Sequence, residues 1–149
     1  MVTGTFEETL AHALFLARHI HKGDLQCAAT AVLLELQVPT NRIGFDYLKH
    51  AIILFCDDPT QMITKELYPA VGKLYEAKPG VLQVEQAIRA VIKAAWKNRN
   101  EKIWWYYFPS GIDENGNLQR PSNSEFIAGI GRFLELWQGC CEEINYGYR

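Results

Sequence analysis

A stripe of polar residues runs along one side of a predicted helix in the middle of the chain. Between residues 81 and 100, apolar side chains recur at the period of a buried helix face, at Val84, Ala87, Ile88, Val91, Ile92 and Ala95. The opposite stripe carries side chains that can hydrogen-bond to nucleic-acid bases or phosphates, at Glu85, Gln86, Arg89, Lys93 and Lys97. A helix with a buried back and a polar, donor-rich front is typical of one that enters the major groove of DNA.

The residues before this helix predict a second, shorter helix that would position it. Pro69 suits the first turn of a helix, because proline has no N–H to leave unpaired there. That helix should end near Tyr75, and Lys78-Pro79-Gly80 should form the turn that follows. We therefore predict a helix-turn-helix over 69–98, with Lys78 as a further DNA contact. Any surface helix of an all-α domain would show the same periodicity.

The charge of the chain is divided unevenly along its length. The formal net charge is −2, yet the segment 62–100 holds seven basic and three acidic residues, which leaves the rest of the chain acidic. Binding to a polyanion depends on the local field, so a basic segment within an acidic protein is compatible with a nucleic-acid partner.

Length and composition indicate one globular domain over residues 1–149. Nearly half of the 149 residues are apolar, and no apolar run is long enough to span a membrane. The first residues lack the basic start and cleavage site of a signal peptide. We expect a cytoplasmic protein with no membrane contact.

Helical periodicity predicts a compact all-α domain of six to seven helices. The helices expected outside the helix-turn-helix are Phe6–His21, Leu25–Leu36, Phe45–Phe55, Gln61–Tyr68 and Phe126–Gln138. Ser122 and Glu125 should form a capping box before the last of them, and the tail from Gly139 should be frayed. The aromatic run 103–108 suggests a loop pinned by buried rings or a small hairpin at Asn115-Gly116. Core packing is the favoured role of these rings over a platform for single-stranded nucleic acid.

No arrangement of residues typical of an enzyme or a metal site is present. The four cysteines lack zinc-site spacing; Cys27 and Cys56 are expected in the core, and Cys140-Cys141 could oxidise between chains in vitro. The histidines of the first helix, His12, His19 and His21, are expected at the surface. There is no nucleophile–base pair and no phosphate-binding loop. We therefore expect no enzyme activity, no metal and no cofactor.

Three stretches together resemble the C-terminal effector domain of the sporulation response regulator of spore-forming Firmicutes, the Spo0A family. They are Ile63-Thr64-Lys65-Glu66-Leu67-Tyr68-Pro69, Val84-Glu85-Gln86-Ala87-Ile88-Arg89 with Ala95-Trp96, and Pro121-Ser122-Asn123-Ser124-Glu125-Phe126-Ile127-Ala128. The resemblance covers roughly Leu25 to Trp137 and leaves residues 1–24 as an extra N-terminal helix before a domain at 25–138. It also implies an effector domain that stands alone, without a receiver domain.

This resemblance implies an all-α domain that binds short DNA boxes and regulates transcription in sporulation. In that family a glutamate and an arginine one turn apart read base edges, and they fall on Glu85 and Arg89. An arginine fork fits the two acceptors of guanine, and a carboxylate can accept from the cytosine amino group. A helical Glu–Arg pair that only supports the helix is the alternative role.

The chain departs from the family pattern on the same helix. Leu82, Gln83, Gln86 and Ala90 stand where the family usually has basic or polar residues, and the turn before the helix is about two residues longer. We therefore expect a double-stranded DNA-binding protein, or alternatively a protein-interaction module that kept the fold and lost DNA binding.

The wide apolar arc of Phe6–His21 predicts a homodimer.

Overall fold

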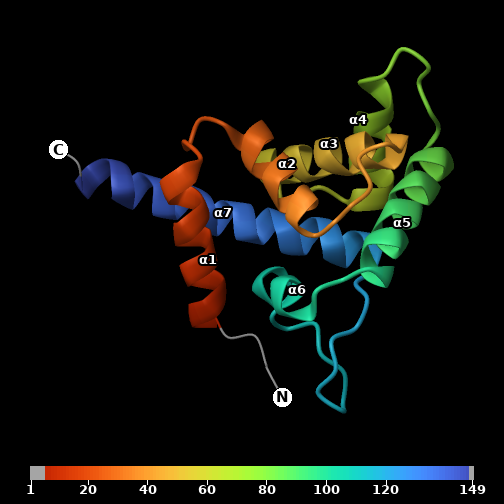
Figure 1. Ribbon diagram of the computed structural model, residues 1–149. Helices are drawn as coiled ribbons and strands as arrows, with labels where there is room; N and C mark the ends of the chain where they lie inside the picture. Colours follow the sequence, from red (N-terminus) through yellow and green to blue (C-terminus); the bar gives the residue numbers. More distant parts are fainter. Residues whose placement is uncertain (1–5, 148–149) are drawn as a thin grey trace.

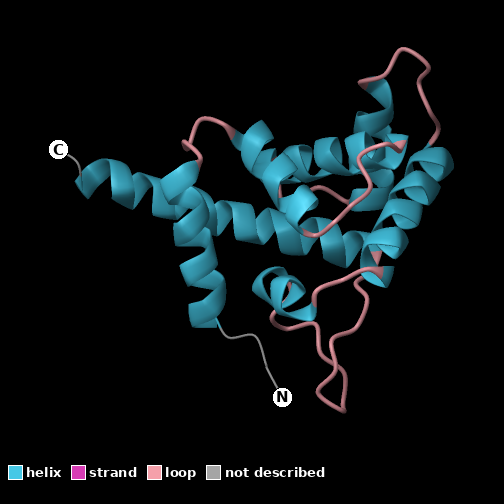
Figure 2. Ribbon diagram, viewed as in Figure 1, coloured by secondary structure: helices cyan, strands magenta, loops and turns pink. Residues whose placement is uncertain are grey.

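The computed structural model describes residues 6–147, so residues 1–5 of the predicted N-terminal segment 1–24 lie outside the described residues. Within 6–147 the chain forms seven α-helices and one π-helical turn (Figures 1 and 2). In chain order these are α1 (Phe6–His19), α2 (Leu25–Glu35), α3 (Ile43–Asp57), η1 (Ile63–Leu67), α4 (Tyr68–Lys73), α5 (Val81–Lys97), α6 (Glu101–Tyr107) and α7 (Asn123–Gly147). The predicted all-α fold class is confirmed. None of these helices combines the length and apolarity needed to cross a bilayer.

The long helix α7 passes through the centre of the molecule, with α1 crossing its C-terminal half and α3 packed along it (Figure 1). Its predicted apolar face is fully buried, at Phe126, Ile127, Ile130, Phe133, Leu134 and Trp137. Two glycines let neighbouring rings approach its backbone. A Cβ on Gly131 would lie 2.3 Å from Cδ1 of Phe55, and one on Gly129 would lie 2.7 Å from Cε1 of Phe108. Tight packing therefore explains why residues of low helix propensity occur here.

The N-terminus of α7 is capped as predicted, but its C-terminus is not where the sequence placed it. Ser122 Oγ accepts a hydrogen bond from the Glu125 amide at 3.1 Å, and the Glu125 carboxylate accepts from the Ser122 amide at 3.0 Å. The expected frayed tail from Gly139 is wrong, because the helix continues to Gly147. Tertiary packing holds this extension: Cys141 is buried against α1 and its Sγ donates to the Ile20 carbonyl oxygen.

The burial of the two adjacent cysteines contradicts the expected oxidation between chains. Cys140 is 6% exposed and Cys141 is 3% exposed, so neither sulfur is available to another molecule. Burial also raises the pKa of both thiols, which disfavours the reactive thiolate. The expectation for Cys27 is also wrong: we expected this residue in the core, but it is exposed on α2.

The aromatic segment forms a helix, α6, where the sequence suggested a loop or hairpin. Asn100 caps it by accepting a hydrogen bond from the Lys102 amide at 3.1 Å. Trp104, Trp105 and Tyr107 are buried, which confirms the core-packing interpretation of these rings. The predicted hairpin is reduced to a loop with one isolated bridge between Ile112 and Leu118.

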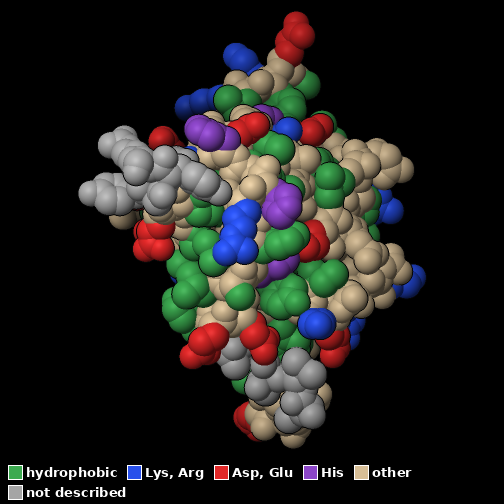
Figure 3. Space-filling view, turned by 60° about the vertical axis from the view of Figure 1, so that its left-hand side comes forward, with side chains coloured by type: hydrophobic (Ala, Val, Ile, Leu, Met, Phe, Trp, Pro, Cys, Tyr) green, Lys and Arg blue, Asp and Glu red, His purple; other side chains and the backbone are tan. Residues whose placement is uncertain are grey.

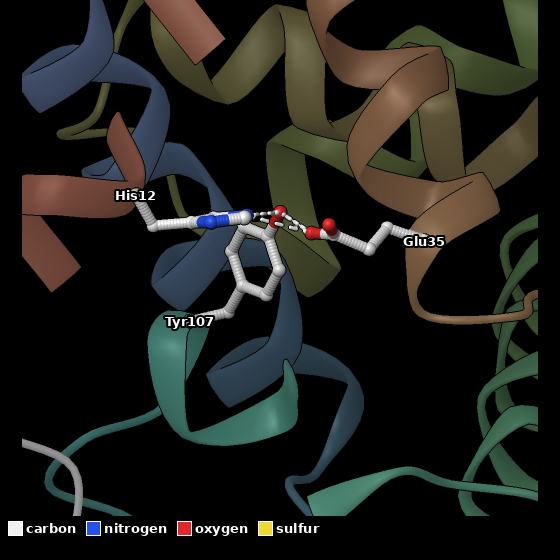
Figure 4. A network of polar contacts seen from close by, with 3 residues as sticks. All are labelled: His12, Glu35 and Tyr107. Carbon is white, nitrogen blue, oxygen red and sulfur yellow. Dashed lines mark hydrogen bonds and ion pairs between the residues drawn. The ribbon is translucent and has the colours of Figure 1, made fainter. Parts of the chain in front are cut away.

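A polar cluster joins three helices beside the middle of α1 (Figure 4). His12 of α1 lies 2.8 Å from a Glu35 carboxylate oxygen on α2 and 3.0 Å from the Tyr107 hydroxyl on α6, measured from Nε2. The Tyr107 hydroxyl also donates to Glu35. The His12 ring stacks on Tyr106 with centroids 4.4 Å apart, and its side chain is only 14% exposed. The expectation that His12 is a surface residue is therefore wrong, whereas His19 and His21 are exposed.

This cluster predicts a pH-dependent contribution to stability. Burial raises the pKa of Glu35, but hydrogen bonds from His12 and Tyr107 outweigh it, so the pKa lies below its usual 4.5. A carboxyl group whose pKa is lower in the folded than in the unfolded chain stabilises the fold at pH values above its unfolded-state pKa. This stabilisation is lost as the pH falls through the folded-state pKa. Glu35→Gln should cost about 1–2 kcal/mol of unfolding free energy at pH 7, and less near pH 3.5.

Urea denaturation at the two pH values measures this difference. Glu114→Gln, at an exposed loop position, is the control and should change stability little at either pH. An equal cost of Glu35→Gln at both pH values would contradict the depressed pKa.

Candidate nucleic-acid interface

Helix α5 divides into the two faces that the sequence predicted. Its buried face comprises Val84, Ile88, Val91, Ile92 and Ala95. Of the predicted contact residues on this helix, Gln86, Arg89, Lys93 and Lys97 are exposed, and Glu85 is half-buried. The opposite face packs against α3 and α4, so the polar stripe is held outward by the core behind it.

The contact between α3 and α5 is unusually close at one glycine. A Cβ built on Gly44, near the start of α3, would lie only 2.2 Å from the Ala87 carbonyl oxygen and 2.9 Å from Cγ1 of Val91. Only glycine allows the two helices to meet at this separation. The position of α5, and with it the polar stripe, therefore depends on Gly44.

Glu85 and Arg89 form an ion pair along α5. Arg89 Nη2 lies 2.5 Å from Glu85 Oε1, with the arginine side chain 62% exposed and the glutamate side chain 26% exposed. This is the i,i+4 arrangement that supports a helix. It also holds a donor fork and a carboxylate side by side, which are the groups that could contact guanine and cytosine.

Lys78 stands outside α5, in the turn between α4 and α5. Its backbone has a φ of 47°, a left-handed conformation that is unfavourable for a residue with a side chain. The turn packs tightly on α4, because a Cβ on Gly72 would lie 2.5 Å from the Pro79 carbonyl oxygen. Lys78 is exposed at this turn, beside the start of α5.

A groove lies along one side of α5, facing the segment that enters α7. This α5–α7 groove has a volume of about 310 Å³. It is lined by Thr64, Tyr68, Glu85, Arg89, Ile92, Lys93, Arg120, Pro121, Ser122, Asn123 and Ser124. Sequence reasoning missed Arg120, because it stands in a loop far from α5 in the chain. The only signal was its position beside the Pro121–Ala128 stretch.

Asn123 joins the two sides of the α5–α7 groove. Its side-chain amide nitrogen donates to the Glu85 carbonyl oxygen at 3.1 Å. Burial raises the pKa of Tyr68 on the groove floor, against an opposing hydrogen bond from the Asn123 side chain. Tyr68 therefore stays protonated at neutral pH, and the groove's ionised groups come from its arginines, Lys93 and Glu85.

A larger pocket of about 760 Å³ lies elsewhere, between α1, the loop after α6, and α7. It shares Arg120 and Pro121 with the α5–α7 groove but contains none of the residues predicted to contact DNA. Within residues 6–147, no three of the His, Cys, Asp and Glu side chains gather as metal ligands do.

Most of the chain matches one known protein family. The sequence matches the family described as "Sporulation initiation factor Spo0A C terminal" over residues 29–134. The match includes α3 to α6 entirely, together with most of α2 and the first half of α7. The chain therefore belongs to the Spo0A C-terminal family, a family of DNA-binding effector domains that regulate transcription in sporulation.

Proposed function

We propose that this chain binds specific sequences of double-stranded DNA through a helix-turn-helix formed by α4, the turn at 74–80 and α5. The observation that carries the proposal is the exposed polar stripe on a helix whose other face is buried against α3 and α4. In this arrangement α5 enters the major groove and α4 positions it. The helix-turn-helix at 69–98 would belong to a domain at 25–138, with residues 1–24 as an addition to it.

We assign the six candidate residues to two kinds of contact. Glu85, Gln86 and Arg89 lie on the first half of α5 and would contact base edges. Lys78, Lys93 and Lys97 flank them and would contact phosphates, which position the protein without reading sequence. This division predicts different effects of substitution at the two sets of residues.

A selection experiment tests the proposed function. The purified chain is incubated with a pool of random duplexes, and bound duplexes are sequenced over successive rounds. A shared motif should be enriched, and binding to it should exceed binding to a scrambled duplex. Failure to enrich any motif, with a folded protein, would contradict sequence-specific binding.

Binding to DNA should be strongly salt-dependent. The polar stripe, the turn and their surroundings offer about 3–5 phosphate contacts per chain, so log affinity should fall with log salt at a slope of about −2.7 to −4.5. Fluorescence anisotropy at several salt concentrations measures this slope. An affinity that does not change with salt would contradict an electrostatic contact through this face.

One observation favours the alternative of a protein-interaction module. Leu82, at the start of α5, is 64% exposed, and Ala90 adds a further apolar residue to the exposed side. Apolar side chains that gather on an exposed helix surface can mark a protein-interaction site. Leu82→Lys distinguishes the two functions, because it should strengthen binding to any duplex but weaken binding to a protein partner.

We also propose that the chain forms a homodimer through α1. Phe6, Leu10 and Phe15 are 65%, 38% and 57% exposed, and the face that includes α1 shows apolar side chains between charged ones (Figure 3). Covering these side chains would remove apolar surface from water. Sedimentation of the wild-type chain should show a dimer, and Phe15→Ser should shift it toward monomer. A wild-type monomer at high concentration would contradict this assembly.

A further inference from the structure

The α5–α7 groove contains more positive charge than its own carboxylate can neutralise. Three basic residues line it, Arg89, Lys93 and Arg120, against the single carboxylate of Glu85. Glu85 pairs with Arg89, and among the described residues neither Lys93 nor Arg120 forms an ion pair. The hydroxyl groups of Thr64, Ser122 and Ser124 add hydrogen-bond donors to the same lining. Cations and hydroxyl donors together suit a phosphate oxygen.

The groove is also in the right place for a DNA backbone. An α-helix with its side chains is about 10–12 Å across, and the major groove is about 12 Å wide, so a helix in the groove has a phosphate strand close to each side. The α5–α7 groove runs along one such side, and Arg89 and Lys93 belong to both the polar stripe and the groove. A strand beside α5 would therefore lie in the groove and meet Arg120 on its far wall.

We propose that the α5–α7 groove holds one sugar-phosphate strand of the bound duplex, and that Arg120 is a phosphate contact outside the helix-turn-helix. This inference rests on the proposed DNA binding through α5. The partner is a phosphodiester backbone, so Arg120 adds affinity and fixes the orientation of the protein without reading sequence.

The backbone around Arg120 is held in place before any DNA binds. The preceding residue, Gln119, donates its amide to the Gly111 carbonyl oxygen at 2.9 Å, and the following residue, Pro121, is buried. Beyond them, the Ser122–Glu125 capping box and the Asn123 hydrogen bond to α5 fix the start of α7. The Arg120 side chain itself is exposed, so binding requires little rearrangement of the fold.

Titration of Arg120→Ala against a selected duplex and a scrambled one tests the proposal. Affinity should fall about three- to tenfold on both duplexes, and the salt slope should become shallower by about one. Arg132→Ala is the matched control, because Arg132 is an exposed arginine on α7 that lines the other pocket and not this groove. It should bind both duplexes as the wild type does. Thermal melting of each variant checks that the fold is kept.

A second measurement locates the contact on the DNA. Replacing single phosphates with neutral methylphosphonates should identify one position whose neutralisation weakens the wild type but not Arg120→Ala. If Arg120→Ala binds both duplexes with unchanged affinity and salt slope while Arg89→Ala loses discrimination, the groove proposal is wrong and the proposed function stands. If the wild type binds no duplex, both are wrong.

Discussion

Arg89→Ala should weaken binding to the selected duplex by about 1–3 kcal/mol, with a much smaller effect on a scrambled duplex. The expected loss is large because two hydrogen bonds from one arginine to guanine distinguish guanine from the other bases. Stability should change by about 0.5 kcal/mol or less, since Arg89 is exposed and its one ion pair is to Glu85 on the same helix. Anisotropy titrations and thermal melts measure the two effects separately.

Lys97→Ala provides the contrast to Arg89→Ala. Lys97 is exposed at the end of the same helix, and a phosphate contact there should weaken both duplexes by a similar factor. If Arg89→Ala loses no discrimination while it melts like the wild type, then Arg89 only supports the helix. The protein-interaction function would then be favoured.

Gly44→Ala should destabilise the fold by about 3 kcal/mol, at the upper end of the cost of overpacking. The added methyl group would meet the Ala87 carbonyl oxygen at 2.2 Å, and backbone cannot move aside as a flexible side chain can. Helices α3 and α5 would have to separate, so DNA affinity should fall as well. Urea denaturation gives the stability, and titration of the folded variant gives the affinity.

Gly139→Ala is the control for this substitution. Gly139 lies within α7, and a Cβ there would meet no heavy atom within 4 Å beyond the adjacent residues and the nearby backbone of its own helix. Alanine should therefore stabilise the chain by about 0.5–1 kcal/mol through its higher helix propensity. A Gly44→Ala chain that unfolds at the wild-type urea concentration would show that α3 and α5 do not meet this closely.

The helices that carry a clear 3.6-residue period were predictable from the sequence. The six residues expected on the α7 face are buried, and so are five of the six expected on α5, with Ala87 half-buried. The regular recurrence of apolar side chains on a long helix leaves little ambiguity. In α6 the sequence shows no helical period of apolar and polar residues, because aromatic residues occupy consecutive positions and point to several sides of the helix. The N-cap at Asn100 was the available signal for a helix there.

The other differences come from tertiary contacts that a local pattern cannot contain. His12 is largely shielded from solvent because Glu35 and Tyr107 approach it from helices distant in sequence. The C-terminal extension of α7 is helical because α1 covers Cys141. Arg120 was missed as a candidate for the same reason, since its nearness to Lys93 arises from the fold.

The length of α7 sets the geometry of any target site read by a dimer. At 25 residues it is about 37 Å long, with α5 near its first turn and α1 across its C-terminal half (Figure 1). A symmetric dimer joined through α1 would hold its two α5 helices at opposite ends, up to about 70 Å apart, which is about two turns of duplex. Such a dimer would bind an inverted repeat with half-sites about 21 base pairs apart between centres. Two copies bound side by side without α1 contacts would instead tolerate direct repeats at closer spacing.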